Sequence, residues 1–459
     1  MSSLSGDRPV RRARFPAIWL IAILLFPLDV CSPAVQPGEK DPRTGRAQPS
    51  DRFPRPELQD RLERLRAVPY VDFSPDSTAE ERGGVVWQVP RKTWPGYNFH
   101  CSRSDGWVEL LDMDGQTVHR WIYQPKKGAG SDHAMMLENG DVLVIEKYLS
   151  LVRLDWNSRK IWERRIRAHH DLAVTPQGNI YVIVRDWKHY RSMRVWFDAL
   201  VLLTPDGEEI DRWHTYDHLD DLKRALDTRP FLDTVLDSAL GDGPKRGPAA
   251  TRVKSAVADD QYDFDYFHLN TVGLIPDNPL GLQDDRFRAG NLLICLRNVN
   301  QIVILEPETG RALWSWGQGE LEWPHHPTML PGGTILVFDN GVHRKYSRVL
   351  ELDPVGKAIV WEYRASPPED LFSNRRGAAQ RLPNGNTLIT ESDRGRVFEV
   401  TPAGEIVWTW LNPVKKKGRR QTVYRMLRLP GTLVEPLLRK WWWWDVGEGM
   451  KIEDRRSKT

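Results

Sequence analysis

The chain has 459 residues, of which 40% are hydrophobic and 28% charged, so it can bury a large core and is not expected to be disordered as a whole. Its 65 Lys and Arg against 62 Asp and Glu are too balanced to indicate a nucleic-acid-binding surface. The 20 Trp, 34 Gly and 33 Pro favour many short strands joined by turns over an all-helical fold. Three cysteines, Cys31, Cys101 and Cys295, exclude a disulfide framework or a zinc knuckle.

The amino-terminal segment has the order of parts of a signal peptide. An apolar run at 15–28 follows Arg8, Arg11, Arg12 and Arg14. This run of roughly 14 residues is short for a bilayer core of about 30 Å. We therefore expect a signal peptide over 1–32, with an uncleaved membrane anchor as the alternative, followed by a Pro-rich polar linker over 33–80. Either reading places the rest of the chain outside the cytoplasm, periplasmic or secreted.

From residue 105 onward, one pattern of two turns recurs about six times along the chain. The first turn, of the type x-Asn-Gly or x-Gly-Gly, precedes an alternating β-branched run, as in a β-hairpin. The second turn contains Gly and leads to a strand that carries a Trp. The first turn lies at 137–140, 175–178, 330–333 and 382–385, and the second leads to Trp121, Trp213, Trp314, Trp361 and Trp408.

These units predict an all-β fold, a six-bladed β-propeller over 81–430, because no unit can bury its faces alone. The stretch 215–264 breaks the pattern and has a helical apolar spacing, which predicts a helical insertion on one face, a candidate lid. The tail 431–459 contains four consecutive Trp residues at 441–444. We expect this Trp-rich tail to pack against the propeller, with contact to a membrane interface as the alternative.

Several histidines occupy related points in successive units, just before the innermost strand. His133 and His326 each precede the first turn by four residues, and His170 lies one residue further from its turn. His268 opens the fourth unit within the segment 265–270. Innermost strands surround the central channel of a propeller, so we expect these side chains to converge at one mouth. A lone histidine is more often structural, whereas a ring of them indicates a site.

Two chemistries could use such a ring. Neutral imidazoles with nearby carboxylates would bind a transition metal, and the candidates are Asp171, Asp265 and Asp339. Imidazoles with a guanidinium would instead surround a tetrahedral sulfate or phosphate ester. Arg297, on the strand after His268, favours the anion, because a fixed positive charge repels a metal ion. We therefore expect no metal, while a rim salt bridge is the structural alternative for Arg297.

Residues 100 to 430 resemble the bacterial arylsulfotransferase family. The motifs that carry the resemblance are His169-His170-Asp171, Asp265-x-x-His268-x-Asn270, Arg297 in its strand, and His325-His326 followed by Phe338-Asp339-Asn340-Gly341. The resemblance implies an exported propeller enzyme that moves a sulfuryl group from an aryl sulfate ester to a phenolic acceptor without a nucleotide donor. The chain also has no phosphate-binding loop of the Gly-x-x-x-x-Gly-Lys type, and no cofactor is expected.

By this resemblance, His326 is the nucleophile that is transiently sulfurylated, and His325 takes its place if the register shifts by one. Such a covalent intermediate predicts ping-pong kinetics. The residues implied to hold the sulfuryl oxygens are His170, His268, Asn270 and Arg297. The predicted catalytic set is therefore His326, His268, Arg297 and His170, and the predicted substrate-binding set is Asn270, His325, His133 and Asn340.

Two other functions stay open from the sequence. Residues 308–314 resemble the Trp-docking repeat of quinone-dependent dehydrogenases, although those propellers are usually larger and carry vicinal cysteines. An exported binding platform with a structural histidine ring is the non-catalytic alternative. The expected partners are a small aryl sulfate and a phenol, not nucleic acid. A membrane tether at the amino terminus and a homodimer also stay open, and no sequence feature argues for the dimer.

Overall fold

The computed structural model describes residues 72–74, 82–126, 130–190, 193–226, 233 and 264–447 of the chain. The chain divides into two units, 1–58 and 59–459, and all described residues lie in the second. The predicted signal or anchor segment 1–32 and most of the linker 33–80 lie outside the described residues, as does most of the insertion 215–264. Among the helices that the structure describes, none is both long and apolar enough to span a bilayer.

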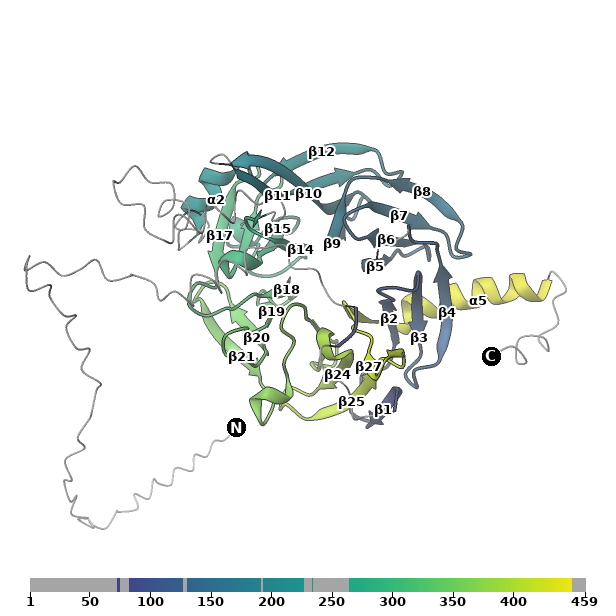
Figure 1. Cartoon of the computed structure of the whole chain (residues 1–459). Helices are drawn as coiled ribbons and strands as arrows, with labels where there is room; N and C mark the ends of the chain where they lie inside the picture. Colours follow the sequence, from purple (N-terminus) through teal and green to yellow (C-terminus); the bar gives the residue numbers. More distant parts are fainter. Residues whose placement is uncertain are drawn as a thin grey trace, which may run out of the picture. The chain divides into compact units, whose positions relative to one another are not determined.

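Six antiparallel sheets stand in a ring around a common axis, so the predicted six-bladed β-propeller is confirmed (Figure 1). We number the blades in chain order from the one that contains β2. From the axis outward, blade 1 is β28 (Met426–Leu429), β2 (Tyr97–Cys101), β3 (Trp107–Leu111) and β4 (Thr117–Ile122). Blade 2 is β5 (Ser131–Met136), β6 (Val142–Glu146), β7 (Ser150–Leu154) and β8 (Lys160–Arg164). Blade 3 is β9 (Ala168–Val174), β10 (Ile180–Tyr190), β11 (Met193–Leu203) and β12 (Glu209–His214), with β13 (Phe264–Asp265) parallel to β11.

The remaining three blades follow the same order. Blade 4 is β14 (Leu269–Leu274), β15 (Leu292–Leu296), β16 (Gln301–Leu305) and β17 (Ala312–Trp316). Blade 5 is β18 (His325–Met329), β19 (Ile335–Asp339), β20 (Arg348–Asp353) and β21 (Ala358–Tyr363). Blade 6 is β22 (Ala378–Arg381), β23 (Thr387–Glu391), β24 (Arg396–Val400) and β25 (Ile406–Leu411), with β1 (Gly84–Gln88) on its outer edge. Helix α2 (Leu219–Ala225) opens the insertion.

The two ends of the propeller chain close the ring. Blade 1 takes its innermost strand, β28, from the carboxyl-terminal part of the chain and its other three strands from the amino-terminal part. Blade 6 gains β1 beside β25. The repeat pattern ends near Leu411 and does not reveal β28, because this strand has no hairpin turn of its own after it. Because strands from both ends of the propeller chain pair in one sheet, the backbone hydrogen bonds between them close the ring.

Tryptophans of the outermost strands join neighbouring blades. At five of the six interfaces, the indole Nε1 donates a hydrogen bond of 2.9 to 3.1 Å to a carbonyl in the turn between the third and fourth strands of the next blade. These pairs are Trp162 with Pro205, Trp213 with Gly310, Trp314 with Pro354, Trp361 with Pro402, and Trp408 with Met113. The recurring Trp of the sequence pattern is therefore an anchor between blades as well as within them.

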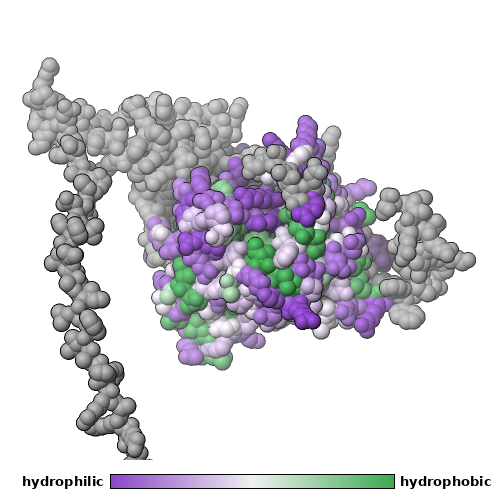
Figure 2. Space-filling view, turned by 90° about the horizontal axis from the view of Figure 1, so that it is seen from below, coloured by the Kyte–Doolittle hydropathy of each residue, from purple (hydrophilic) through white to green (hydrophobic). Residues whose placement is uncertain are grey.

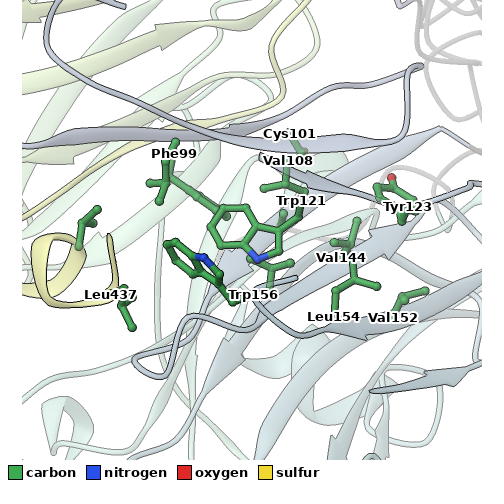
Figure 3. Packing of buried hydrophobic residues seen from close by; sticks show 14 residues of the cluster. Phe99, Cys101, Val108, Trp121, Tyr123, Val144, Val152, Leu154, Trp156 and Leu437 are labelled. Atoms are coloured by element: carbon green, nitrogen blue, oxygen red, sulfur yellow. The ribbon is translucent and has the colours of Figure 1, made fainter. Parts of the chain in front are cut away.

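The interface between blades 1 and 2 is built differently. Trp156 lies in the turn of blade 2, Trp121 meets its ring edge-on at 5.3 Å, and His119 stacks on it at 3.7 Å. Val434 and Leu437 of α5 (Gly431–Gly447) pack into the same cluster (Figure 3). The start of the predicted tail thus covers this interface. The side chains of its four tryptophans lie outside the described part of the chain, so their packing stays a prediction.

One face of the propeller is mostly polar. Figure 2 shows a largely hydrophilic face on which hydrophobic residues gather in small groups. Most of the exposed large hydrophobic side chains lie on outermost strands, and these are Trp87, Ile122, Ile161, Ile210, Ile359 and Val360. The middle strands β6, β15 and β19 are buried along their whole length. The core therefore lies between the faces of adjacent blades, which leaves the ends of the innermost strands to carry polar groups.

Candidate active site

The first turn of each blade shows which residues of different blades are equivalent. In blades 2 to 6, the backbone N–H of the residue that opens this turn donates at 2.8 Å to the carbonyl of the residue just before the second strand. The turn-opening residues are Leu137, Thr175, Ile275, Leu330 and Leu382. The turn of blade 4 is not among the predicted ones, because the long connection 276–290 separates its two ends.

Counting back from these turns sorts the polar residues of the innermost strands into two layers. The residues five positions before the turn are Asp132, His170, Asn270 and His325, which we call the His325 ring. The residues four positions before the turn are His133, Asp171, Thr271 and His326, which we call the His326 ring. By this count His325 aligns with His170, whereas His326 shares with His170 a left-handed backbone conformation.

The innermost strands are irregular at this level. The pairing of β14 with β15 shifts register between Leu269 and Thr271, and that of β18 with β19 shifts between His325 and Thr328. His170, His268 and His326 have positive φ angles of 59°, 52° and 49°, a left-handed conformation that few residues other than Gly adopt. Such a bulge redirects side chains locally. Strict strand alternation therefore does not apply to the His325-His326 pair.

His325 is held in a single tautomer. Its Nδ1 lies 2.7 Å from Oδ1 of Asn340 and 3.0 Å from the carbonyl oxygen of Trp323. The Asn340 amide is oriented by its Nδ2, which donates to the carbonyls of Ser373 and Arg376 at 2.6 and 2.8 Å. Both neighbours of Nδ1 are thus acceptors, so Nδ1 carries the proton and Nε2 keeps its lone pair. This Nε2 is buried and has no hydrogen-bond partner among the described residues.

Arg297 lies beside this imidazole. Burial and the charge of Arg297 lower the pKa of His325 to about 3, so the ring is neutral at pH 7. The guanidinium of Arg297 stacks on Trp323 at 4.5 Å from the ring centroid and bonds to Oδ1 of Asn298 at 3.0 and 3.2 Å. It is 5% exposed, so its charge acts in a medium of low polarity. An anion next to His325 would therefore meet a strong, fixed positive field.

His268 is paired with a carboxylate instead of an amide. Its Nδ1 lies 2.7 Å from Oδ2 of Asp265, and Arg185 bonds to the same oxygen at 2.6 Å. Burial, and then Arg297, lower the pKa of His268 to about 3. Burial acts to raise the pKa of Asp265, but the nearby His268 and Arg185 hold it below its usual range. The ring of His268 stands 4.8 Å from that of His170, edge to face.

The His326 ring contains a closed ion pair. Arg425 bonds to both oxygens of Asp171, at 3.0 and 3.1 Å, and Nε2 of His133 lies 3.6 Å from Oδ1 of Asp171. His326 hydrogen-bonds to the backbone of Ala379, and burial followed by Arg425 holds its pKa well below the usual value. The backbone N–H of His326 donates to Oγ1 of Thr271 at 3.0 Å. The positive charge of Arg425 near His326 is thus already balanced by the carboxylate of Asp171.

Asn270 supports the strand that carries His325. Its Nδ2 donates to the carbonyl oxygen of Pro324 at 2.9 Å, and Sγ of Cys295 lies 3.1 Å from the same oxygen. Among the predicted site residues, the structure therefore gathers His170, His268, Arg297 and His325, with Asn270 and Asn340 as supports. His133 and His326 lie together in the second layer.

Two cations that the sequence analysis did not single out share the position of Arg297. Lys147, Arg185 and Arg297 each follow by six residues the residue that closes the first turn, in blades 2, 3 and 4. Asn340 takes this position in blade 5. The same count along the sequence could have found Lys147 and Arg185, because the turns of blades 2 and 3 were already recognised. Adjacent blades therefore direct three cations toward one level of the propeller.

Comparison with known proteins identifies a family. The family model described as Arylsulfotransferase (ASST) matches residues 133–413. No curated protein sequence matches the chain. A solved structure of a protein of unknown function from Bacteroides caccae is similar, with 16% identity, a TM-score of 0.45, and coverage of 72% of this chain and 98% of that one.

Two lyase structures are also similar. A streptogramin B lyase has 12% identity and a TM-score of 0.40, with 74% of this chain and 87% of that chain covered. An inactive variant of virginiamycin B lyase from Staphylococcus aureus has 12% identity and a TM-score of 0.40, with 75% and 89% covered. All three TM-scores are below 0.5, so these likenesses carry no argument, whereas the family model covers blades 3 to 6, most of blade 2 and all eight predicted site residues. The chain belongs to the arylsulfotransferase family.

Proposed function

We propose that the protein transfers a sulfuryl group from an aryl sulfate to a phenol through a covalent intermediate on His325. The observation that carries this proposal is the neutral, single-tautomer imidazole of His325 next to the buried guanidinium of Arg297. A buried lone pair beside a fixed cation suits attack on an anionic ester. The sequence prediction of His326 as the nucleophile stays open and is tested against His325 below.

In the first half-reaction, Nε2 of His325 attacks sulfur while the bond from sulfur to the aryl oxygen breaks. Arg297 balances the negative charge that the sulfuryl oxygens carry throughout. Asn340 keeps the proton on Nδ1, so Nε2 remains the attacking atom. In the second half-reaction, a phenol attacks sulfur and His325 leaves as a neutral imidazole. The enzyme returns to its starting state, as ping-pong kinetics require.

His268 has a different task in this proposal. The carboxylate of Asp265 at its Nδ1 stabilises an imidazolium, whereas the amide at Nδ1 of His325 does not. An anion bound at His268 therefore favours uptake of a proton, after which Nε2–H donates to a sulfuryl oxygen. His170, whose ring contacts that of His268, completes this side of the site.

The test is a stopped-flow burst with a nitrophenyl sulfate, with and without an added phenol. We expect one equivalent of nitrophenol per active site without acceptor, faster turnover with acceptor, and a protein that gains the mass of one sulfuryl group on the peptide containing His325. The H325A variant should show no burst, and the matched H326A variant should keep it. A burst in H325A and none in H326A would return the nucleophile to His326. A folded wild type that releases no phenol from any donor would favour the binding platform.

We also propose that the enzyme acts outside the cytoplasm, on the basis of the basic and apolar order of residues 1–32. Fractionation of expressing cells tests this, with the mass of the mature amino terminus separating a cleaved signal from a retained anchor. A full-length protein in the cytoplasmic fraction would contradict the proposal.

A further inference from the structure

Lys147 lies at a blade position that is shared with two other cations near the candidate active site. It lies directly after β6, in the blade position that Arg185 and Arg297 hold in the next two blades. Its backbone N–H bonds to the carbonyl of Gly130 at 2.8 Å, and its Nζ lies 5.1 Å from the ring centroid of Tyr148. It acts electrostatically on His170, the residue that also responds to His325 and His268. Lys147 is thus a primary amine beside the imidazole cluster.

The charges around Lys147 come from four parts of the chain. Asp132 on β5 and Asp72 of the amino-terminal segment favour its charged form, whereas Arg103 and Arg376 oppose it. Burial outweighs these effects and lowers the pKa of Lys147 to about 8. Asp132 is shared, because its Oδ1 bonds to Arg103 at 3.0 Å and its Oδ2 accepts the backbone N–H of His170 at 3.3 Å. Asp132 thus acts on the charge of Lys147 and also bonds to the backbone of His170.

The transfer needs a group that can hold and release a proton near neutral pH. A departing phenolate takes up a proton, and an attacking phenol gives one away. The cluster imidazoles are poor candidates, because burial keeps His170 and His325 neutral at pH 7, and the proton that His268 takes up with the ester stays in its bond to a sulfuryl oxygen. Arg297 stays charged at any working pH. An amine that titrates slightly above neutrality suits both directions, because its ammonium is acidic enough to protonate a phenolate and the free amine can take the proton of an attacking phenol.

We infer that Lys147 is the general acid and base of the sulfuryl transfer. This inference rests on the proposed function and adds a residue to it. In the first half-reaction, the bond from sulfur to the aryl oxygen breaks, the oxygen keeps the electron pair, and the Lys147 ammonium gives it a proton. In the second, the phenol oxygen forms its bond to sulfur, the bond from sulfur to Nε2 breaks toward nitrogen, and the Lys147 amine takes the phenol proton. Each turnover restores the ammonium.

The first test compares leaving groups in the first half-reaction of the full chain. For K147M we expect the burst rate to fall about 10²- to 10⁴-fold with phenyl sulfate, whose phenolate needs a proton, and less than about 10-fold with a nitrophenyl sulfate, whose phenolate does not. The nitrophenyl burst also shows that the variant is folded. An equal loss with both donors would overturn the inference, since it would indicate a role in binding or folding.

A matched variant separates charge from proton transfer. K147R keeps the positive charge but cannot release its proton near pH 8. We expect K147R to retain the nitrophenyl burst and to lose the phenyl sulfate reaction as K147M does. A K147R enzyme as active as wild type with phenyl sulfate would overturn the inference, because charge alone would then suffice.

The pH profile supplies an independent readout. In the wild type, the burst with phenyl sulfate should fall above about pH 8, where the Lys147 ammonium loses its proton, and acceptor-dependent turnover should fall below it. Both limbs should vanish in K147M. Parallel profiles for the two half-reactions would contradict the inference. If the wild type gave no burst and no sulfurylated peptide, the proposed function itself would fail, and this outcome is distinct from those that concern Lys147.

Discussion

The His325 and His326 rings lie one residue apart on the same innermost strands, yet they differ in how their charges are balanced. In the His326 ring, Arg425 is bound by both oxygens of Asp171. In the His325 ring, Arg297 stacks on Trp323 and bonds to an amide oxygen of Asn298. Arg425 already holds a carboxylate through two bonds, which weakens its attraction for a sulfate ester. The comparison suggests that the first ring serves chemistry and the second serves stability.

Removing Arg425 should give the largest effect on stability. The R425M variant leaves the buried carboxyl of Asp171 without its cation, which we expect to cost about 3–5 kcal/mol of the free energy of unfolding. Urea denaturation measures this loss. The burst with a nitrophenyl sulfate should stay within about 10-fold of wild type where the variant is folded. A stable R425M enzyme that has lost its burst would assign Arg425 to the chemistry instead.

Removing Arg297 should lower the catalytic rate more than it lowers the stability. Loss of this cation in R297M should lower kcat/KM about 10²- to 10³-fold, as loss of one preorganised donor does in other enzymes. The free energy of unfolding should change less than in R425M, because Arg425 binds both oxygens of a buried carboxyl and its loss leaves that group without its cation. Parallel kinetics and urea titrations check both parts. R297K is the matched control, and it should recover part of the rate but not all, since an ammonium lacks the planar fork.

Asn340 allows a further test of the difference between the two rings, because its contact with Nδ1 fixes a tautomer of His325 that His326 does not share. In N340A, Nδ1 keeps only the carbonyl of Trp323, so we expect kcat to fall about 10- to 100-fold. Nitrogen NMR of the imidazole should show a mixture of tautomers in place of a single Nδ1–H form. A fall in kcat with an unchanged tautomer would show that Asn340 acts in another way.

Lowering the pH should lower the free energy of unfolding through the histidines of both rings. Burial lowers the pKa values of His133, His170, His268, His325 and His326 below the value of about 6.5 of an unfolded chain. The unfolded state therefore binds more protons below pH 6.5, and the free energy of unfolding falls as the pH is lowered toward 3. Between pH 7 and 5 we expect a loss on the order of 1–2 kcal/mol per histidine. Urea titrations at both pH values test this, and H326Q should reduce the difference by one histidine's share.

Much of the fold follows from local patterns. The turns at 137–140 and 382–385 and the Trp of each outer strand recur at intervals that a single blade sets, so the blade count could be read without the structure. Two parts escaped this reading. Strand β28 pairs with β2 across the whole chain, and no local signal marks such a pairing. The turn that begins at Ile275 closes only after a long connection, so the sequence pattern did not identify it as equivalent to the first turns of the other blades.

The sequence by itself determined which side chains gather at the propeller axis, because every blade delivers its innermost strand there. The tertiary structure decided which of two adjacent histidines meets Arg297. Bulges shift the pairing between His325 and Thr328, and contacts from other blades then separate the pair: burial and Arg297 lower the pKa of His325, and burial and Arg425 lower that of His326. A one-residue difference in register cannot be read from spacing when it is set by partners far along the chain, because register depends on pairing rather than on local propensity.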